Sequence, residues 1–221
     1  MEQPAAATRP RMPKVPRIPP MTVRRLSTYY RLLRQLEAKG ETEPLSSERI
    51  SQLTGFTAAQ VRRDLAYFGS FGKRGVGYDI AELQQSLRSI LGLDHPWHIA
   101  LIGVGNLGTA LMAYPGFARQ GFHIVAAFDV DATKHGRRIG TIVVRPMEDL
   151  PEVVREQGIL MAIMTVPASA AQQVADAAVK AGIKGILNFA PVQLQVPKDV
   201  YVSSVDLSIE IEYLSYLLTN A

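Results

Sequence analysis

Residues 98–108 read His98-Ile99-Ala100-Leu101-Ile102-Gly103-Val104-Gly105-Asn106-Leu107-Gly108, an apolar run that leads directly into glycines spaced G-x-G-x-x-G. The apolar run predicts a buried β-strand, and the residues after Gly108 predict a helix. A second strand is predicted at 124–128 and ends at Asp129, 21 residues beyond Gly108. This order of strand, glycine turn, helix and strand predicts a parallel βαβ unit with a ligand site at its first turn.

The three glycines have distinct roles toward a dinucleotide. Gly103 permits the tight turn, Gly105 lets a pyrophosphate approach the backbone, and Gly108 lets the helix pack closely on the strand. The amides at the helix N-terminus then face the phosphates. The predicted phosphate loop consists of Gly103, Val104, Gly105, Asn106, Leu107 and Gly108.

Asp129 indicates which dinucleotide is bound. A carboxylate at this strand end accepts hydrogen bonds from ribose hydroxyls and repels a 2′-phosphate, which favours NAD(H) over NADP(H). Arg137 and Arg138 lie downstream and could compensate the charge of a phosphate. The alternative is a Rossmann domain without a nucleotide, in which Asp129 merely ends a strand.

The alternation continues to the end of the chain and predicts a complete doubly wound parallel sheet over residues 97–206. Further strands are predicted at 141–144, 160–166, 185–188 and near Tyr201, and helices at 147–157 and 168–181. Ligands of such sheets lie beyond the carboxyl ends of the strands. The nicotinamide is therefore placed against Thr165, Val166, Pro167, Asn188, Phe189, Ala190 and Pro191. An apolar pocket there disfavours the cationic oxidised ring relative to neutral NADH.

The histidines of the chain are poorly placed for catalysis. All four lie at the domain boundary, at strand ends or after the acidic loop, away from the predicted nicotinamide position. A dehydrogenase needs a proton donor near the transferred hydride. We therefore predict that NAD(H) is bound without turnover, with no catalytic residue. No residue spacing indicates a metal site.

Residues 21–93 predict a separate helical domain. A first helix ends at Gly40, Ser46 and Ser47 offer an N-cap for a second, and Thr57 with Gln60 has the spacing of a capping box for a third. Two short helices joined by a glycine turn form the helix-turn-helix pattern. The side chains expected outside the core on the third helix are Gln60, Arg62, Arg63, Asp64 and Tyr67. The alternative is a small helical bundle with a polar face.

Residues 71–78 place three glycines and two adjacent cations in eight residues, which predicts a hairpin tip. Lys73 and Arg74 then lie where a wing follows the sugar-phosphate backbone. An amphipathic helix follows at 80–91, and 94–96 marks a domain boundary. We predict a winged-helix domain that binds double-stranded DNA through Gln60, Arg62, Arg63, Tyr67, Lys73 and Arg74.

The charge distribution is consistent with DNA binding. Of the 221 residues, 1–90 hold 15 Lys and Arg against 8 Asp and Glu, whereas 91–221 hold 9 against 12. A basic half attracts phosphates, and the remainder does not do so alone. Residues 1–20 carry six of the 14 prolines, which predicts a disordered basic tail. The tail is either a solvated extension or a further contact to DNA phosphates.

The absence of cysteine excludes disulfides, thiolate nucleophiles and Cys-ligated zinc. No apolar stretch approaches the length of a membrane span, and the N-terminus lacks an apolar signal region. We expect a soluble cytoplasmic protein that uses neither a metal nor a membrane.

The combined pattern resembles the Rex family of redox-sensing transcriptional repressors. The most specific stretches are residues 60–69, 72–78, 114–117 and 185–191, and the likeness covers nearly all of the chain after residue 20. The resemblance implies a bacterial homodimer that binds an inverted-repeat operator when NADH is scarce and is released as NADH rises. It also implies control of genes for respiration and fermentative NAD+ regeneration.

The resemblance further implies that the C-terminal helix within 207–221 swaps across the dimer, between the partner's two domains. Its sequence supports this role, because it carries apolar residues beyond one stripe, whereas ordinary packing on its own domain is the alternative. By resemblance, Asp206 pairs with Arg31 in one state and with Tyr114 in the other. Some family members have an aromatic residue after this Asp, and this chain has Leu207.

Two other functions remain open from the residues alone. An NAD-dependent oxidoreductase would consume NADH with a small carbonyl substrate, but the chain is short and the proton donor is missing. A CoA- or nucleotide-binding regulatory protein without DNA binding would share the Rossmann domain. Asp129 argues against CoA, because the adenosine ribose of CoA carries a 3′-phosphate.

Overall fold

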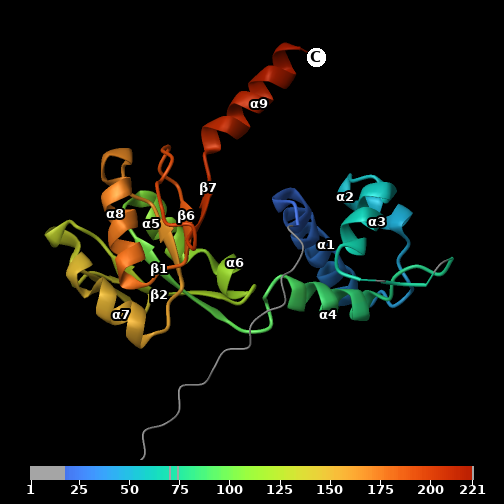
Figure 1. Cartoon of the computed structure of the whole chain (residues 1–221), viewed down its shortest axis with the longest axis horizontal. Helices are drawn as coiled ribbons and strands as arrows, with labels where there is room; N and C mark the ends of the chain where they lie inside the picture. The colour runs from blue at the N-terminus through green and yellow to red at the C-terminus, as the bar shows by residue number, and fades with distance from the viewer. Residues whose placement is uncertain (1–17, 70, 74, 221) are drawn as a thin grey trace, which may run out of the picture. The chain divides into compact units, whose positions relative to one another are not determined.

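The structure, a computed structural model, describes residues 18–69, 71–73 and 75–220 and divides into two compact units, up to Asp94 and from His95 (Figure 1). Most of the predicted tail and Arg74 lie outside the described residues. Helix α1 begins at Pro20, so the helical domain starts one residue earlier than predicted. A proline is tolerated there because the first helical N–H has no intrahelical acceptor.

The N-terminal unit consists of α1 (Pro20–Ala38), α2 (Ser47–Thr54), α3 (Ala58–Ala66) and α4 (Ile80–Ile90). The apolar faces of the four helices form one core, including Leu26, Tyr29, Leu33, Ile50, Val61, Leu65, Leu83 and Leu87. Ser46 caps α2 and Thr57 caps α3, each accepting from a backbone N–H of the first turn. The turn between them closes at Gly55, whose φ of +78° favours glycine.

Half of the predicted capping box at α3 is present. Thr57 Oγ1 accepts from the Gln60 N–H at 3.2 Å, as expected. The Gln60 side chain, however, donates to Asp64 at 3.2 Å, and among the described residues it makes no return bond to Thr57. The return bond needs Gln60 Oε1 to accept from the Thr57 N–H, whereas the charge-assisted bond from Nε2 draws the side chain toward Asp64 instead.

The predicted wing is a tight turn closed by a single bridge. Lys73 pairs with Gly77, and the Lys73 N–H donates to the Gly77 carbonyl at 3.0 Å. A second bridge joins Tyr78, at the end of the predicted wing, to Leu45, which lies just before α2. The described part of the segment therefore holds Lys73 on a turn, as the sequence predicts, but without extended strands.

The C-terminal unit contains one sheet of order β3-β4-β2-β1-β5-β6-β7 among the described residues. The strands are β1 (Trp97–Ile102), β2 (Phe122–Phe128), β3 (Arg138–Ile139), β4 (Ile142–Arg145), β5 (Met161–Met164), β6 (Gly185–Asn188) and β7 (Tyr201–Ser204). All neighbours are parallel except β3 and β4. The prediction of a sheet that is parallel throughout is therefore wrong at one edge. The chain reverses tightly at residues 140–141, so the short strand β3 pairs antiparallel with β4.

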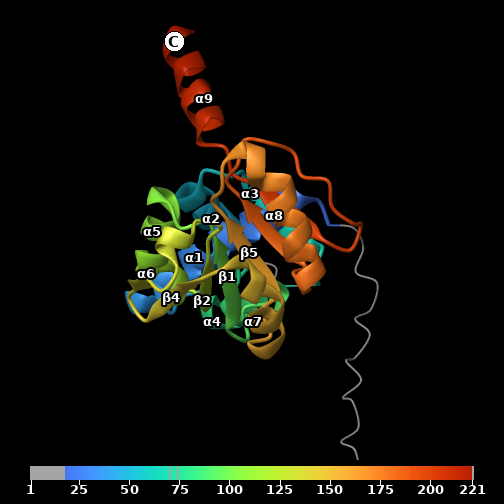
Figure 2. The same cartoon turned by 90° about the vertical axis from the view of Figure 1, so that its left-hand side faces the viewer.

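Helices cover both faces of the sheet, with α5 (Asn106–Ala113) and α6 (Pro115–Ala118) on one and α7 (Leu150–Glu156) and α8 (Ala168–Ala181) on the other (Figure 2). The helix predicted at 147–157 begins with the 3₁₀ turn η2 (Met147–Asp149), and another 3₁₀ turn, η1 (Ala132–Lys134), follows β2. No described helix has the length and apolar character needed to cross a bilayer.

Helix α9 (Leu207–Thr219) is the last helix of this unit (Figure 1). It buries none of its residues, unlike the other described helices of the unit that exceed one turn. Its exposed large apolar side chains are Leu207, Ile209, Ile211, Tyr213, Leu214, Tyr216, Leu217 and Leu218. Packing on its own domain, the alternative considered for this helix, does not occur. Isolated helices of this length are marginal in water, so α9 needs a partner surface.

Candidate nucleotide cleft and nucleic-acid interface

A cleft of about 460 Å³ opens at the carboxyl ends of β1, β2 and β5. It lies at the point where the strand order reverses, since β2 and β5 flank β1 on opposite sides. Open α/β sheets bind ligands at this position. The cleft is lined by Ile102, Gly103, Gly105, Asp129, Val130, Asp131, Lys134, Thr165, Val166, Pro167, Ala170 and Val174.

The glycines of the loop are required for different reasons. Gly103 has φ +99°, and a Cβ there would lie 2.7 Å from the Thr165 carbonyl oxygen. A Cβ on Gly108 would overlap the Gly103 carbonyl oxygen, so helix α5 packs on the loop only with glycine at this position. Gly105 has φ −89°, and a Cβ added there would meet no atom within 4 Å. The fold alone therefore does not require glycine at 105, and the open space belongs to the cleft.

The other loop residues do not line the cleft with their side chains. Val104 is buried in the core, and it contributes only a backbone N–H, which donates to Asp129 Oδ2 at 2.7 Å. Asn106 and Leu107 are exposed in the first turn of α5 and are absent from the cleft lining. Of the six predicted loop residues, Gly103 and Gly105 line the cleft, and ligand contacts of the other four stay a prediction.

Asp129 is buried at the end of β2 and holds three donors. Oδ2 accepts from Val104 N–H and from Lys134 Nζ at 2.9 Å, and Oδ1 accepts from Asp131 N–H at 2.9 Å. Burial alone would raise the pKa of Asp129, but these hydrogen bonds outweigh it and lower the pKa. The carboxylate is therefore ionised at neutral pH. Lys134 also lines the cleft, and the sequence analysis missed it. Its only signal in the sequence is a cation five residues after Asp129.

Of the predicted nicotinamide contacts, the residues that follow β5 line the cleft and the residues at the end of β6 and after it do not. Thr165, Val166 and Pro167 line the cleft, and Thr165 Oγ1 donates to the Gly103 carbonyl at 2.6 Å. Asn188 is fully buried and does not line it, because its side chain bonds to its own turn. It donates to the carbonyls of Ala190 and Val192 and accepts from the Ala190 N–H.

Phe189, Ala190 and Pro191 are likewise outside the cleft lining. Ala190 is buried, and Phe189 donates its N–H to the Met164 carbonyl, which places the segment beside the end of β5. Asn188 is therefore a structural residue of this loop, and a ligand reaches 189–191 only by extending beyond the cleft.

The three residues expected to form the switch are accessible within their own units. Arg31 is exposed on α1, and Tyr114 is exposed with its ring edge-on to Phe117 at 5.2 Å. Asp206 caps α9 by accepting from the Ser208 N–H at 2.9 Å, and its Oδ2 has no partner among the described residues. The pairing of Asp206 with Arg31 or Tyr114 stays a prediction.

The exposed side of α3 carries the predicted DNA contacts. Arg63 and Tyr67 are exposed, and Arg63 makes no hydrogen bond or ion pair with another described residue. Arg62 is engaged, since its Nη1 donates to Glu48 Oε1 at 2.8 Å and to Ser47 Oγ at 2.7 Å. This ion pair is exposed and therefore weak, so Arg62 can leave it for a phosphate. Lys73 is exposed on the turn, and Arg74 lies outside the described residues.

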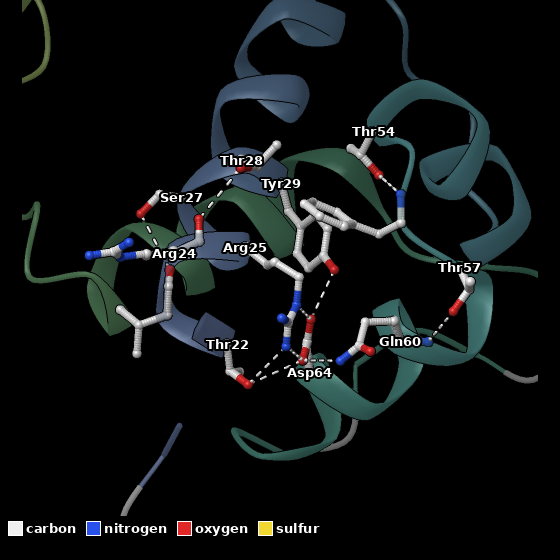
Figure 3. Close-up of polar contacts among 12 residues, drawn as sticks. Thr22, Arg24, Arg25, Ser27, Thr28, Tyr29, Thr54, Thr57, Gln60 and Asp64 are labelled. Atoms are coloured by element: carbon white, nitrogen blue, oxygen red, sulfur yellow. Dashed lines mark hydrogen bonds and ion pairs between the residues drawn. The ribbon is translucent and has the colours of Figure 1, made fainter. Parts of the chain in front are cut away.

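Asp64 was expected on the polar face of α3, and the structure contradicts this. Its side chain is fully buried, and Arg25 donates to it through Nε at 2.6 Å and Nη2 at 2.7 Å (Figure 3). Tyr29, Thr22 and Gln60 donate to the same carboxylate. Burial alone would raise the pKa of Asp64, but these donors lower it. The helical pattern places Asp64 beside the apolar face, and only its partners on α1 draw it inside.

A four-helix DNA-binding unit joined to a Rossmann domain with a nucleotide cleft defines a ligand-responsive DNA-binding protein. Residues 17–66 match the family model described as "Putative DNA-binding protein N-terminus", and 94–192 match the model of a CoA binding domain. Redox-sensing transcriptional repressor Rex of Carboxydothermus hydrogenoformans is 52% identical over 90% of this chain and 96% of the relative. The redox-sensing transcriptional repressor Rex of Thermus thermophilus is 47% identical over 92% of this chain and 95% of the relative.

The chain belongs to the Rex family of redox-sensing transcriptional repressors. This membership confirms the expected repressor and excludes the enzyme alternative. Among solved structures, RSP in complex with β-NAD+ and operator DNA is 38% identical, with TM-score 0.86 over 92% of this chain and 93% of that one. RSP in complex with β-NADH is 36% identical, with TM-score 0.83 over 93% and 96%. The predicted two-domain α/β architecture is confirmed.

Proposed function

We propose that the chain is a cytoplasmic, homodimeric repressor that binds operator DNA when NADH is scarce and is released by NADH. The observation that carries the proposal is the likeness over nine-tenths of the chain to one protein solved with NAD+ and operator DNA and also with NADH. The cleft at the Rossmann switch point supports NAD(H) as the effector. The exposed apolar surface of α9 supports a dimer, because large exposed apolar patches mark interfaces.

Fluorescence anisotropy of a labelled inverted-repeat duplex tests this function directly. At fixed salt, which strongly affects DNA affinity, the protein is titrated separately with NADH, NAD+ and NADPH. We expect NADH to release the DNA at concentrations at which NAD+ and NADPH do not. A protein that stays on the duplex at saturating NADH contradicts the redox-sensing function.

Asp129→Asn is expected to weaken NADH binding about tenfold, because the ribose loses a charge-assisted hydrogen bond. The measurement is a titration of NADH fluorescence. Asp131→Asn is the matched control, since Asp131 lines the same cleft but has a more exposed side chain. Equal losses in the two variants would contradict a specific contact of Asp129 with the ribose.

Arg63→Ala and Lys73→Ala are expected to affect DNA binding differently. Arg63→Ala should lose about 1–3 kcal/mol of operator discrimination, whereas Lys73→Ala should weaken all duplexes and reduce the salt slope by about one. Lys180→Ala, which removes an exposed cation of the Rossmann domain, is the control. Salt titrations with operator and unrelated duplexes separate the two effects, and the reverse pattern would exchange the base and backbone assignments.

Asp206→Ala is expected to bind NADH normally but to release DNA less completely. NADH shifts the DNA-binding equilibrium only through contacts that differ between the two states, and the Asp206 carboxylate supplies one. NADH-driven release is compared with that of Glu210→Ala, which removes a neighbouring carboxylate of α9. A release curve identical to that of the unmodified protein would remove Asp206 from the switch.

A further inference from the structure

The buried carboxylate of Asp64 joins α3 to α1 and also to the side chain of Gln60 (Figure 3). We propose that Asp64 is a positioning residue for sequence recognition, which holds the Gln60 amide in the orientation that reads an adenine in the major groove. The proposal rests on the DNA-binding function proposed above and adds a determinant of its specificity.

The orientation of the Gln60 amide follows from the chemistry of its partner. Asp64 is ionised, because Arg25 donates to both of its oxygens and Tyr29 donates to Oδ2 at 2.9 Å. An ionised carboxylate only accepts hydrogen bonds. Of the two ends of the amide, therefore, only Nε2 can face Asp64 Oδ1, at 3.2 Å. A flipped amide would bring two acceptors together and leave the bond unmade.

The orientation leaves a defined pair of groups for a ligand. Asp64 uses one of the two Nε2 protons, and Oε1 has no partner among the described residues. One donor and one acceptor on the same amide match the N7 acceptor and N6 amino donor of adenine. A phosphate offers acceptors only, so it would leave Oε1 without a donor.

The position of Gln60 on α3 is suitable for reading a base. It is the third residue of the helix, and the N-terminal residues of a recognition helix approach base edges. Its N–H is already capped by Thr57, so the first turn is held at both the backbone and the side chain. A side chain restrained before binding loses less conformational freedom on DNA. The partner of Gln60 is a fully buried carboxylate, whereas the ion-pair partner of Arg62, Glu48, is exposed.

The test begins with selection of preferred sites from a random duplex library by the full-length unmodified chain. Competition assays then compare each single-base substitution in the selected site for the unmodified chain, Gln60→Ala and Asp64→Asn. We expect both variants to lose, by about tenfold, the preference for adenine at one and the same position of each half-site. Preferences at the other positions should remain.

A modified base supplies an independent measurement. 7-Deazaadenine lacks the N7 acceptor, so at that position it should weaken binding by the unmodified chain and leave binding by Asp64→Asn unchanged. If the unmodified chain binds adenine and 7-deazaadenine equally at every adenine of the half-site, the proposal is overturned.

Tyr29→Phe is the matched control, because it removes one donor to Asp64 without touching the Gln60 contact. It should lower the melting temperature and keep the adenine preference. If Asp64→Asn does not fold, the paired variant Arg25→Gln with Asp64→Asn removes both charges of the ion pair and should show the same loss.

Two results would contradict the positioning role of Asp64. One is an adenine preference retained by Asp64→Asn, or by the paired variant, but lost in Gln60→Ala. The other is an equal loss of that preference in Tyr29→Phe. An unmodified chain that selects no sequence would instead contradict the repressor function, so the two failures are distinguishable.

Discussion

Gly105→Val is expected to leave the chain folded and to abolish the release of operator DNA by NADH. Residue 105 has φ −89°, and no atom lies within 4 Å of a Cβ built there, so the ligand-free fold accommodates the side chain. In the proposed NAD(H) complex, however, the pyrophosphate approaches the backbone at this glycine. The added Val side chain overpacks this contact at a cost of about 3 kcal/mol. Such a cost weakens NADH binding by about 100-fold.

The control for this prediction is Gly108→Ala, which adds one carbon at a position where the fold requires glycine. That Cβ would overlap the Gly103 carbonyl oxygen and lie 2.9 Å from Thr165 Oγ1. Gly108→Ala should therefore lower the melting temperature, whereas Gly105→Val should not. Calorimetric titration with NADH and a thermal melt measure the two effects. Normal NADH affinity in Gly105→Val would show that the pyrophosphate does not lie on this loop.

The pair Ile211→Asp with Leu214→Asp is expected to give a folded monomer that has lost operator binding. Both side chains are largely exposed in the single chain, at 67% and 57%, so no contact within it is lost. In a dimer sealed by α9, each buried side chain contributes about 1.5–3 kcal/mol. Two such changes in each of two chains cost at least about 6 kcal/mol, which weakens the dimer by more than about 10,000-fold.

Operator binding should fall with the dimer, because the two half-sites are held by two linked recognition helices. Sedimentation velocity measures the oligomeric state, and anisotropy measures the affinity for the duplex. Glu212→Gln, a change at an exposed polar residue of α9, is the control. A double variant that remains dimeric would show that another surface joins the chains.

The parts of this protein that the sequence predicts well depend on local patterns. The glycine loop and Asp129 lie within 27 residues that form one βαβ unit, and α8 and β6 begin and end at the predicted residues. Caps such as Ser46 and Thr57 bond to backbone amides three residues away. Such features are recognisable because the interacting groups are close along the chain.

Only the tertiary structure decided the role of several polar side chains. Their hydrogen-bond partners either lie far away in the sequence or occupy the groups that would otherwise bind a ligand. Asp64 is buried because Arg25 and Tyr29, on another helix, compensate its charge, and helical periodicity contains no information on that pairing. Asn188 has the residue type and position of a ligand contact, but it satisfies its own turn. The sequence by itself therefore determined the two domains, the nucleotide loop and the family. The packing of helices and loops decided which predicted contact residues are free to bind, because a buried polar group must first satisfy its own hydrogen bonds.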